Sequence, residues 1–430
     1  MLNYKETIKQ LPNKLYKVLK HAGEIGDVLG IKVYVVGGFV RDLILKEKNF
    51  DIDLVVEGDG IFFAQKLNEK IKGYINVYDE FGTASIELKN DIIDIVTARS
   101  EYYQYPAALP TVKMNSIWHD LYRRDFTINS MAIKLNSLEF GNLLDYFGGL
   151  TDIKNRVIRV HHSSSFTDDP TRILRIIRFA GRLNFTIEEK TKQYMQKALE
   201  QNMILKISDD RIRKEIIHIL EEKSFSNIIS IMECYGIFQN IDPNLIIKKD
   251  TIKKLHNLET SICEFSKYTR NYIDKNIIKI MHILESFPLD KLSNILTKFV
   301  SDKKCILTLI FTLTKKKDVY IKIKNKKLDK YDLYKILEPY SIESLIFYYN
   351  DCENYIIKDH IRFYVKNLKD IKIDITGKDL KSLNIKPGPI YAEILNNVLK
   401  AKILGEVDDY IDEINYVKKF YNIRKNNIDT

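Results

Sequence analysis

The hydrophobic pattern of this 430-residue chain changes between residues 160 and 170. Before that point, short β-type apolar runs such as KVYVVGG, TASIEL and VIRVHH alternate with a few helical stretches. From about residue 170 onward, apolar residues recur at helical spacing, as in TRILRIIRFAGRL. Alternating strands and helices favour layers around a mixed sheet, whereas a sustained helical period favours packed helices. The sequence therefore predicts an α+β chain with a sheet-containing N-terminal part and an all-helical remainder.

Composition and charge narrow the possible classes of protein. Because the chain has no 18-residue apolar run and no cleavage-like N-terminal signal, we expect neither a membrane span nor a secretory signal. The four cysteines form no CxxC pair, which favours a reduced, cytoplasmic setting over a zinc site or a disulfide framework. A net charge of +10 permits a polyanionic partner, although a coding bias towards lysine alone gives the same charge. The lysine-dense stretch 315–330 is either a solvated helix or hairpin face or a phosphate-contacting patch.

Two aspartates, Asp51 and Asp53, interrupt an apolar run that is otherwise typical of a buried strand. Residues i and i+2 of a strand share a face, so the two carboxylates would lie side by side, at a high cost unless their charge is compensated. Two Mg²⁺ ions about 3.5–4 Å apart require such a pair, although an exposed strand with two acidic residues is the alternative. Asp94, in DIIDIVTAR, is either a third metal ligand or a solvent-facing strand residue.

The segment GGFVRD follows the apolar strand VYVV and begins a helical pattern. Gly37 and Gly38 allow backbone N–H groups to approach a phosphate at the helix N-terminus. Their spacing differs from the dinucleotide-binding G-x-G-x-x-G pattern. Arg41 either contacts a triphosphate while Asp42 orients it, or the two form a structural ion pair.

A second helix is predicted to start at DDP, with Asp169 as N-cap and Pro170 as its first residue. Apolar residues on one side of this helix would pack inward. Arginines recur on the other side at Arg172, Arg175, Arg178 and Arg182. Guanidinium groups aligned in this way repel one another unless a bound anion or a network of neighbouring acids lies against them.

Five motifs occur in one order with compact gaps: GGFVRD, DID, RRDFTINSMA, DYFGGLTDI and FTDDPTRILRIIRFAGRLNF. In this order they resemble the class II tRNA nucleotidyltransferases, which are the CCA-adding and A-adding enzymes, and their bacterial poly(A) polymerase relatives. The close match covers roughly residues 30–220. The resemblance implies a polymerase-β-like nucleotidyltransferase head with a mixed sheet, followed by an all-α neck, body and tail. It divides the chain into an N-terminal helix at 1–27, the catalytic head at 28–160, the neck at 161–222, the body at 223–365 and a tRNA-binding tail at 366–430.

The resemblance also assigns roles to residues of the head and neck. Asp51 and Asp53 are implied as catalytic ligands of two Mg²⁺ ions, with Asp94 as the candidate third ligand. Asp169 and Arg172 would pair with the base edge of ATP or CTP in place of a template. The family often has Glu-Asp where this chain has Asp168-Asp169, which leaves the role of Asp168 open. The implied nucleotide-binding set is Gly37, Gly38, Arg41, Arg123, Asp125, Asn129, Asp169, Arg172, Arg175 and Arg178.

Two further groups of residues have structural interpretations. Arg123, Arg124 and Asp125 could form a salt-bridge cluster instead of contacting ribose and phosphate. The motif DYFGGLTDI contains Asp145 and Asp152, which the resemblance places in a hinge and which we expect to be structural.

The remaining expectations concern helix, loop and histidine positions. In ISDDRIRKEIIHIL, helix stabilisation accounts for Arg211 and Glu215, which lie four residues apart. His161 and His162 lack partners at metal-ligand spacing and are expected to be a loop pair. The segment between Arg99 and Arg123 is predicted to be a mobile loop, which the family associates with addition of the terminal A.

The implied reaction is attack of a tRNA 3′-hydroxyl on the α-phosphate of ATP or CTP, with release of pyrophosphate. The segment 377–407, in which a PGP loop precedes a helix, resembles the tail of the tRNA-processing enzymes and favours tRNA as the partner. Two segments, FTDDPTRILRIIRFAGRLNF and TARSEYYQYPAALPTVK, resemble A-adding enzymes more than full CCA-adding enzymes, which slightly favours A-adding activity. A poly(A) polymerase that adds A-tails to RNA 3′ ends is the alternative, and a non-catalytic RNA-binding relative is a second one. The helical half would hold the tRNA acceptor arm by shape and phosphates.

Overall fold

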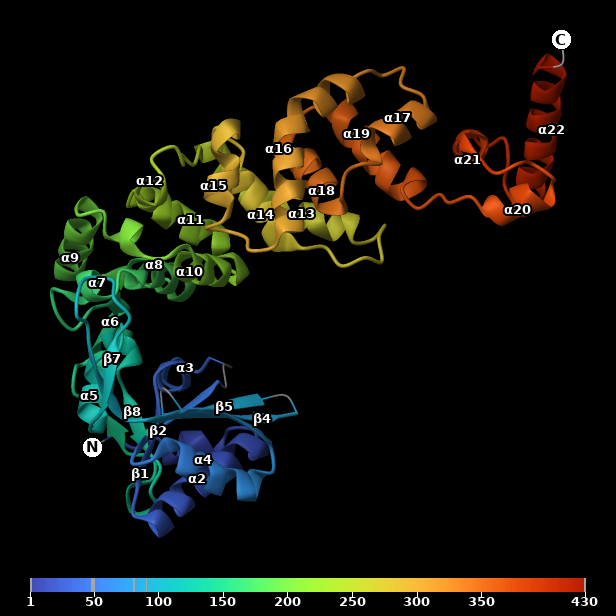
Figure 1. Ribbon diagram of the computed structural model, residues 1–430. Helices are drawn as coiled ribbons and strands as arrows, with labels where there is room; N and C mark the ends of the chain where they lie inside the picture. Colours follow the sequence, from blue (N-terminus) through green and yellow to red (C-terminus); the bar gives the residue numbers. More distant parts are fainter. Residues whose placement is uncertain (1, 48–50, 80–81, 90, 429–430) are drawn as a thin grey trace. The chain divides into compact units, whose positions relative to one another are not determined.

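The structure is a computed structural model that describes residues 2–47, 51–79, 82–89 and 91–428, with side chains up to residue 420 (Figure 1). It contains two units, Met1–Pro243 and Asn244–Thr430. Within the described residues, no helix is long and apolar enough to cross a membrane.

A seven-stranded mixed sheet forms the centre of the N-terminal unit, as predicted. The strand order is β3-β4-β5-β2-β1-β8-β9, and β2 runs parallel to β5 while the other neighbours are antiparallel. The strands are β1 (Lys32–Val36), β2 (Ile52–Glu57), β3 (Tyr74–Tyr78), β4 (Thr83–Leu88), β5 (Asp91–Thr97), β8 (Ala132–Lys134) and β9 (Leu143–Leu144). The predicted strand VIRVHH lies outside this sheet, because β10 (Val157–Ile158) pairs with β11 (Thr186–Ile187).

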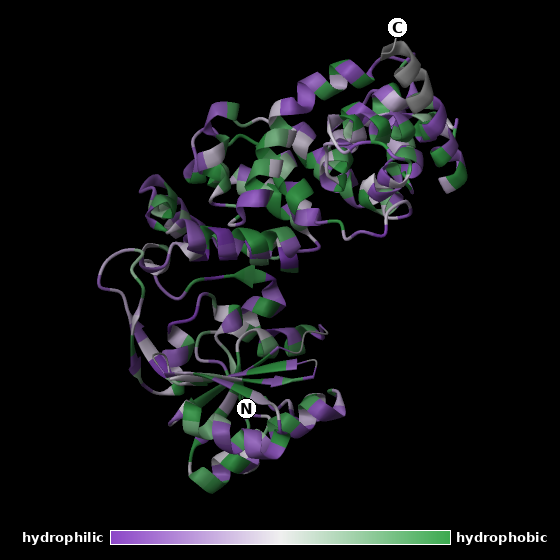
Figure 2. Ribbon diagram, turned by 45° about the vertical axis from the view of Figure 1, so that its right-hand side comes forward, coloured by the Kyte–Doolittle hydropathy of each residue, from purple (hydrophilic) through white to green (hydrophobic). Residues whose placement is uncertain are grey.

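Helices cover both faces of this sheet. α2 (Asn13–Leu29) and α4 (Gly60–Ile71) lie below it in Figure 1, and α3 (Gly38–Leu45) lies above it. Hydrophobic and hydrophilic residues alternate along the helices below the sheet, as expected for helices with one buried side (Figure 2). The predicted single N-terminal helix consists of α1 (Lys5–Lys9) and α2, because Pro12 has no N–H to continue the helical bonding and precedes α2 as its N-cap.

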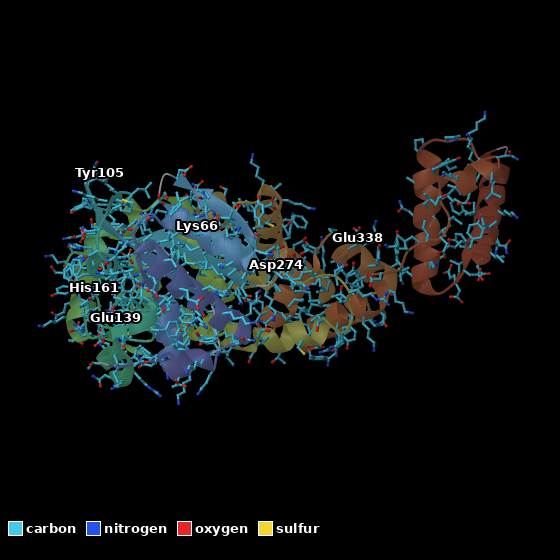
Figure 3. All side chains as sticks on the ribbon, turned by 90° about the horizontal axis from the view of Figure 1, so that it is seen from below. Lys66, Tyr105, Glu139, His161, Asp274 and Glu338 are labelled. Carbon is cyan, nitrogen blue, oxygen red and sulfur yellow. The ribbon has the colours of Figure 1, made fainter. Side chains whose placement is uncertain are left out.

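The segment that was predicted to be a mobile loop has regular structure. β6 (Arg99–Tyr102) and β7 (Thr111–Met114) form an antiparallel ribbon, and α5 (Ile117–Tyr122) follows it. Most residues of the two strands are exposed or half-buried, so the ribbon lacks the apolar alternation that marks a strand in sequence. Tyr105, between the two strands, is 66% exposed and lies at the periphery in Figure 3.

The remainder of the N-terminal unit is helical apart from the short β10–β11 pair, and α8 is its most buried helix. Both α10 and α11 pack against α8. Helix α8 spans Thr171–Leu183 and so begins one residue later than predicted. Asp169 nevertheless has the features expected of a capping residue, since its backbone is extended and its carboxylate accepts from the N–H of Thr171. The helices are α6 (Gly149–Asn155), α7 (Ser165–Asp168), α8 (Thr171–Leu183), α9 (Glu189–Glu200), α10 (Asp209–Glu221), α11 (Phe225–Cys234) and α12 (Ile237–Ile241).

Within the described residues of the C-terminal unit, the regular elements are all helices, joined by loops. Its helices are α13 (Lys249–Phe265), α14 (Lys275–Leu284), α15 (Leu292–Leu296), α16 (Lys303–Ile323), α17 (Lys330–Leu337), α18 (Ile342–Asp351), α19 (Tyr355–Phe363), α20 (Gly377–Ser382), α21 (Pro389–Leu404) and α22 (Tyr410–Ile428). The PGP loop precedes α21 as predicted, with Pro389 as its first residue. Apart from half-buried Lys316, the lysines of 315–330 are exposed, as expected for a solvated helix face. The finer division of the chain into five parts stays a prediction.

Candidate nucleotide-binding and catalytic site

An open polar cavity of about 460 Å³ lies in the N-terminal unit. Its walls come from the end of β1, helix α3, strand β2, the segment that follows α5, and helix α8. The whole predicted nucleotide-binding set lines it: Gly37, Gly38, Arg41, Arg123, Asp125, Asn129, Asp169, Arg172, Arg175 and Arg178. The other lining residues are Asp53, Glu101, Tyr103, Arg124, Phe179 and Arg182. The structure thus brings residues that are far apart in the sequence into one concave site.

Gly37 forms the tight junction between β1 and α3. Its φ of +69° is in the left-handed region, and a Cβ there would lie 2.6 Å from Nη1 of Arg124. The backbone therefore approaches the cavity more closely at this point than a side chain would allow. Arg41, one turn into α3, donates to both carboxylate oxygens of Asp42 at 2.7 and 2.9 Å and to Oδ1 of Asn129 at 2.6 Å. The expected ion pair is present, and it holds Arg41 at the cavity wall.

The candidate metal ligands lie at the edge of this cavity. Asp53 is inside β2, whereas Asp51 precedes the strand and is exposed, so the prediction of two carboxylates within one buried strand is wrong for Asp51. Asp53 is the register partner of Asp94 on the parallel strand β5, and both line a neighbouring cavity of about 290 Å³. Within the described part of the chain, the oxygens of these three carboxylates do not all lie within 4.8 Å of one another.

The electrostatics of this carboxylate set fit a divalent cation. The pKa of Asp53 is raised to about 6, mainly by burial; the charge of Arg124 lowers it, and the charges of Asp94 and Asp51 raise it. Burial and the charge of Asp51 also raise the pKa of Asp94. A hard cation such as Mg²⁺ prefers oxygen ligands, and it relieves the repulsion that disfavours the ionised carboxylates.

Sequence reasoning missed the acids that hold the two arginines of the motif RRDFTINSMA. Asp120, fully buried in α5, accepts hydrogen bonds from Arg123 at 2.7 and 2.9 Å and from Arg124 at 3.0 Å. Although burial alone raises the pKa of Asp120, the two guanidinium groups lower it overall. Glu101 accepts from Arg123 at 2.8 Å. The salt-bridge cluster that the sequence left open is therefore present, and it directs both arginines to the cavity.

A buried ion pair joins helix α8 to this motif. Arg175 donates two hydrogen bonds to Oδ2 of Asp125, at 2.6 and 3.0 Å, and Asn129 donates to Oδ1 at 3.0 Å. Burial alone would raise the pKa of Asp125, but these partners hold it at about 2. Farther along α8, Arg178 lies 3.2 Å from Glu222. The network of neighbouring acids is thus present along the arginine side of α8.

Asp169 and Arg172 are held in place by neighbours on several elements. Oδ1 of Asp169 accepts hydrogen bonds from the backbone and hydroxyl of Thr171, at 3.1 and 2.6 Å, and from Arg211 at 2.7 Å. Its Oδ2 accepts none from the residues that the structure describes. Arg172 donates to Ser165 Oγ and to the carbonyl of Arg123, both at 2.7 Å. Since a guanidinium carries five N–H donors, Arg172 keeps further donors for a ligand.

The expectation that Arg211 and Glu215 of ISDDRIRKEIIHIL stabilise their own helix is wrong. Arg211 contacts Asp169 and not Glu215, while Glu215 lies 3.4 Å from Arg175 and 3.8 Å from Arg178. Arg211 therefore holds the carboxylate of Asp169, and Glu215 holds two arginines of α8, instead of the two residues pairing with each other along α10. Partners on α8 and just before it replace the local helix pair.

The remaining motif residues have structural partners. Asp145 accepts backbone hydrogen bonds from Gly148, Gly149 and Leu150 at the start of α6. Asp152 accepts from the hydroxyl of Thr127 at 2.5 Å. Both contacts support the structural interpretation of these aspartates.

The histidine pair has neighbours that account for it without a metal. His161, labelled in Figure 3, lies 2.7 Å from Ser130 Oγ and packs edge-on against Phe147. Burial and the charge of Arg172 lower the pKa of His161 to about 3, so its imidazole is neutral.

A cluster of one histidine and two carboxylates lies in the C-terminal unit. Among the described residues, His282, Glu285 and Asp351 form the one cluster of three potential metal ligands with all atoms within 4.8 Å. Lys254 lies 2.7 Å and Lys316 3.1 Å from Asp351. These two ammonium groups balance the two carboxylates, so the cluster is explained as a buried ion network.

Comparison with known protein families links this site to nucleotide transfer. Residues 33–159 match the family described as the poly A polymerase head domain, and residues 184–247 match the probable RNA and SrmB-binding site of polymerase A. These two segments contain the sheet, the cavity residues up to Asn129 and the helices that follow α8.

Two curated relatives are similar over almost the whole chain. The A-adding tRNA nucleotidyltransferase of Geobacter sulfurreducens is 35% identical over 414 residues, which are 94% of this chain and 47% of the relative. The chain thus spans about half the length of that protein. The A-adding tRNA nucleotidyltransferase of Halalkalibacterium halodurans is 31% identical over 416 residues, which are 96% of this chain and 94% of the relative.

Solved structures show the same fold. A CCA-adding enzyme in an apo form has a TM-score of 0.84 at 32% identity and covers 97% of this chain and 99% of its own. A CCA-adding enzyme in complex with ATP has a TM-score of 0.82 at 31% identity, over 98% of this chain and 99% of its own. The Thermotoga maritima CCA-adding enzyme complexed with tRNA has a TM-score of 0.78 at 31% identity, over the same shares of both chains. With this fold, these relatives and the five ordered motifs, the chain belongs to the class II tRNA nucleotidyltransferase family.

Proposed function

We propose that this protein is a template-independent tRNA nucleotidyltransferase that builds or repairs the CCA terminus of tRNA. It adds AMP from ATP, and CMP from CTP if it makes the whole terminus, and releases pyrophosphate. The observation that carries the proposal is the convergence of Asp53, the Gly37 junction and the arginine side of α8 on one cavity. The named activities of the relatives and the ATP and tRNA complexes of the structural neighbours support it.

The triphosphate is bound by donors at one side of the cavity. The backbone after Gly37, at the N-terminus of α3, approaches the phosphates, and Arg41 and Arg123 contribute positive charge. Asp51, Asp53 and, as third ligand, Asp94 hold two Mg²⁺ ions. When bound, these ions supply neutralisation of the triphosphate and a lower pKa for the attacking 3′-hydroxyl.

The base is selected at the other side, by Asp169 and Arg172. Thr171 and Arg211 hold one carboxylate oxygen of Asp169, which leaves Oδ2 as an acceptor for an exocyclic amine. Arg172 is a donor fixed by Ser165. Adenine and cytosine each present an amino donor beside a ring acceptor, so one acceptor–donor pair suits both bases and rejects those with the opposite pattern.

Addition of A alone is our preferred activity within the family. The A-adding names of both curated relatives support it over full CCA addition. Poly(A) addition to RNA 3′ ends is the second candidate, because one matching family is described as a poly A polymerase head domain. The cytoplasmic location stays a prediction.

The test is nucleotide incorporation by the purified chain with Mg²⁺ on three primers. These are a tRNA without CCA, a tRNA ending in CC, and an oligo(A), each with ATP and CTP separately and together. One A added only to the CC-ended tRNA means A-adding activity, and completion of the trimmed tRNA means CCA-adding activity. A long tail on oligo(A) means a poly(A) polymerase.

Two controls separate catalysis from RNA binding. Asp51→Ala should abolish incorporation while tRNA binding persists. Binding of tRNA should weaken steeply between roughly 50 and 200 mM salt, because phosphate contacts release counterions. Full binding without incorporation on any primer would indicate the non-catalytic RNA-binding relative.

A further inference from the structure

A second cavity, of about 510 Å³, adjoins the nucleotide cavity and has an aromatic lining. Trp118 and Tyr122 of α5 and Tyr102 of β6 line it, and they are 40%, 38% and 58% exposed. The rings of Trp118 and Tyr122 stack with their centroids 5.3 Å apart and their planes 10° apart. Both rings also contact the ring of Phe147, whose centroid lies 5.7 Å from that of Trp118 and 5.8 Å from that of Tyr122. The ring of Tyr122 also packs against those of His161 and His162, with centroids 5.6 and 5.5 Å away. Phe147 and the two histidines therefore support Tyr122, and Tyr122 supports the exposed Trp118.

The two cavities share a wall that contains charged residues. Glu101, Tyr103, Arg123 and Arg172 line both of them. Arg172 is the proposed base-reading donor, so an occupant of the aromatic cavity lies next to the incoming nucleotide.

The two adjacent aspartates line different cavities. Asp169 lines the nucleotide cavity and Asp168 lines the aromatic one. The oxygen Oδ2 of Asp168 accepts from Ser164 at 3.0 Å, and its side chain is 31% exposed. Asp168 is thus available to a ligand other than the incoming nucleotide.

These features match the chemistry of an unpaired RNA end. Exposed aromatic rings stack on nucleobases, because every base has a π-face. Arginine at the shared wall suits a phosphodiester, and a carboxylate can accept a hydrogen bond from the amino group of cytosine. A purely structural role would account for the contacts to Phe147 and the histidines, but it leaves the exposure of Trp118 and the free space beside it unexplained.

We propose that this aromatic cavity binds the unpaired 3′-terminal bases of the RNA primer, with Trp118 as the stacking platform and Tyr122 as its support. Asp168 accepts from the exocyclic amine of a terminal cytosine. The inference rests on the proposed function, since a primer whose end is bound here places its 3′-hydroxyl beside the nucleotide cavity. It deepens that function by naming the subsite of the second substrate.

Trp118 is the only tryptophan of the chain, which permits a direct test without turnover. A short single-stranded RNA ending in CC should quench the tryptophan fluorescence of the wild-type protein in a saturable way. ATP alone, and a blunt RNA duplex of the same length, should not. Free N-acetyl-tryptophanamide corrects for absorption by the RNA. Unchanged fluorescence at RNA concentrations that saturate binding by an independent method would overturn the proposal, and so would quenching by ATP alone.

Kinetics on the CC-ended primer provide the second readout. Trp118→Ala should raise KM for the primer by roughly 5- to 150-fold, since stacking on one aromatic contributes that much to binding, with KM for ATP unchanged. Trp118→Phe should restore part of the loss. Tyr74→Ala is the matched control, because Tyr74 is 69% exposed on β3 and lines neither cavity.

Asp168→Ala tests the polar contact separately. It should reduce the preference for a CC-ended over a UU-ended primer without changing KM for ATP. An equal rise in KM for ATP and primer in either variant would indicate general disturbance and contradict the subsite. If the wild type incorporates nothing while the RNA still quenches Trp118, the proposed function fails and the RNA site stands.

Discussion

Arg211 of α10 donates a hydrogen bond of 2.7 Å to Oδ1 of Asp169, which lies 42 positions earlier in the chain. The proposed base acceptor is therefore held by a helix outside the motif that contains it. Arg211 also reaches the carbonyl of Ala107, at 3.3 Å, in the segment between β6 and β7. The side chain of Arg211 thus connects the carboxylate of Asp169 with the ribbon formed by β6 and β7.

Replacing Arg211 should affect nucleotide selection more than folding. Arg211→Met leaves Asp169 with Thr171 alone, so the carboxylate can rotate, and kcat/KM for ATP should fall roughly 10- to 100-fold because small misplacements of reacting groups have effects of that size. Discrimination between ATP and GTP should fall with it. Arg213→Met on the same helix is the control, since Arg213 pairs with Asp210 and lines neither cavity. Equal losses in both variants would contradict a positioning role.

Gly37 and Gly30 separate backbone strain from the need for space. Both have φ in the left-handed region, at +69° and +66°, but a Cβ at Gly30 meets nothing within 4 Å. Each change to Ala should lower the free energy of unfolding by about 1–2 kcal/mol. Only Gly37→Ala should also weaken ATP binding, because its Cβ displaces Arg124. Calorimetric ATP titration of the two variants checks this, and wild-type affinity in Gly37→Ala would refute the close approach.

Asp53→Asn should stabilise the metal-free protein while it removes activity. The pKa of Asp53 is about 6 in the folded chain against 3.8 ordinarily. The folded state therefore binds more protons between these values, and stability falls as pH rises through them. The asparagine should remove that slope and add up to about 3 kcal/mol near neutral pH. Urea unfolding without metal measures it, and incorporation should drop by roughly a hundredfold or more.

His161 should make the head sensitive to acid. Its pKa is about 3 in the folded chain against 6.5 ordinarily, so below 6.5 the unfolded state binds a proton that the folded state does not. This contribution to stability is present above pH 6.5 and is lost as pH falls towards 3, with about 5 kcal/mol as its upper bound. Thermal unfolding across this range, compared with His161→Gln, should show a shallower acid slope in the variant. Parallel slopes would rule out His161 as the cause.

Features that depend on neighbours along the chain were predictable from sequence. The strand VYVV, the glycines after it and the arginines along α8 follow from side-chain period and backbone freedom. The five ordered motifs additionally predicted which residues line the cavity. Asp51 marks the limit, because the end of a strand depends on pairing and not on alternation alone.

Features that depend on distant contacts were not predictable. Asp120 and Glu101 carry no local signal, and their role exists only because folding brings two arginines against them. The ribbon of β6 and β7 lacks apolar alternation, so the pairing of its two strands could be recognised only in the structure.

The sequence by itself determined the mixed sheet, the arginine side of α8 and the family. Periodicity, glycine freedom and motif order are all properties of residues close together in the chain. The tertiary structure alone decided the ion networks, the anchoring of Asp169 by Arg211 and the separation of Asp168 from Asp169 into two cavities. These arrangements are set by packing and charge pairing between elements that only meet in the folded protein.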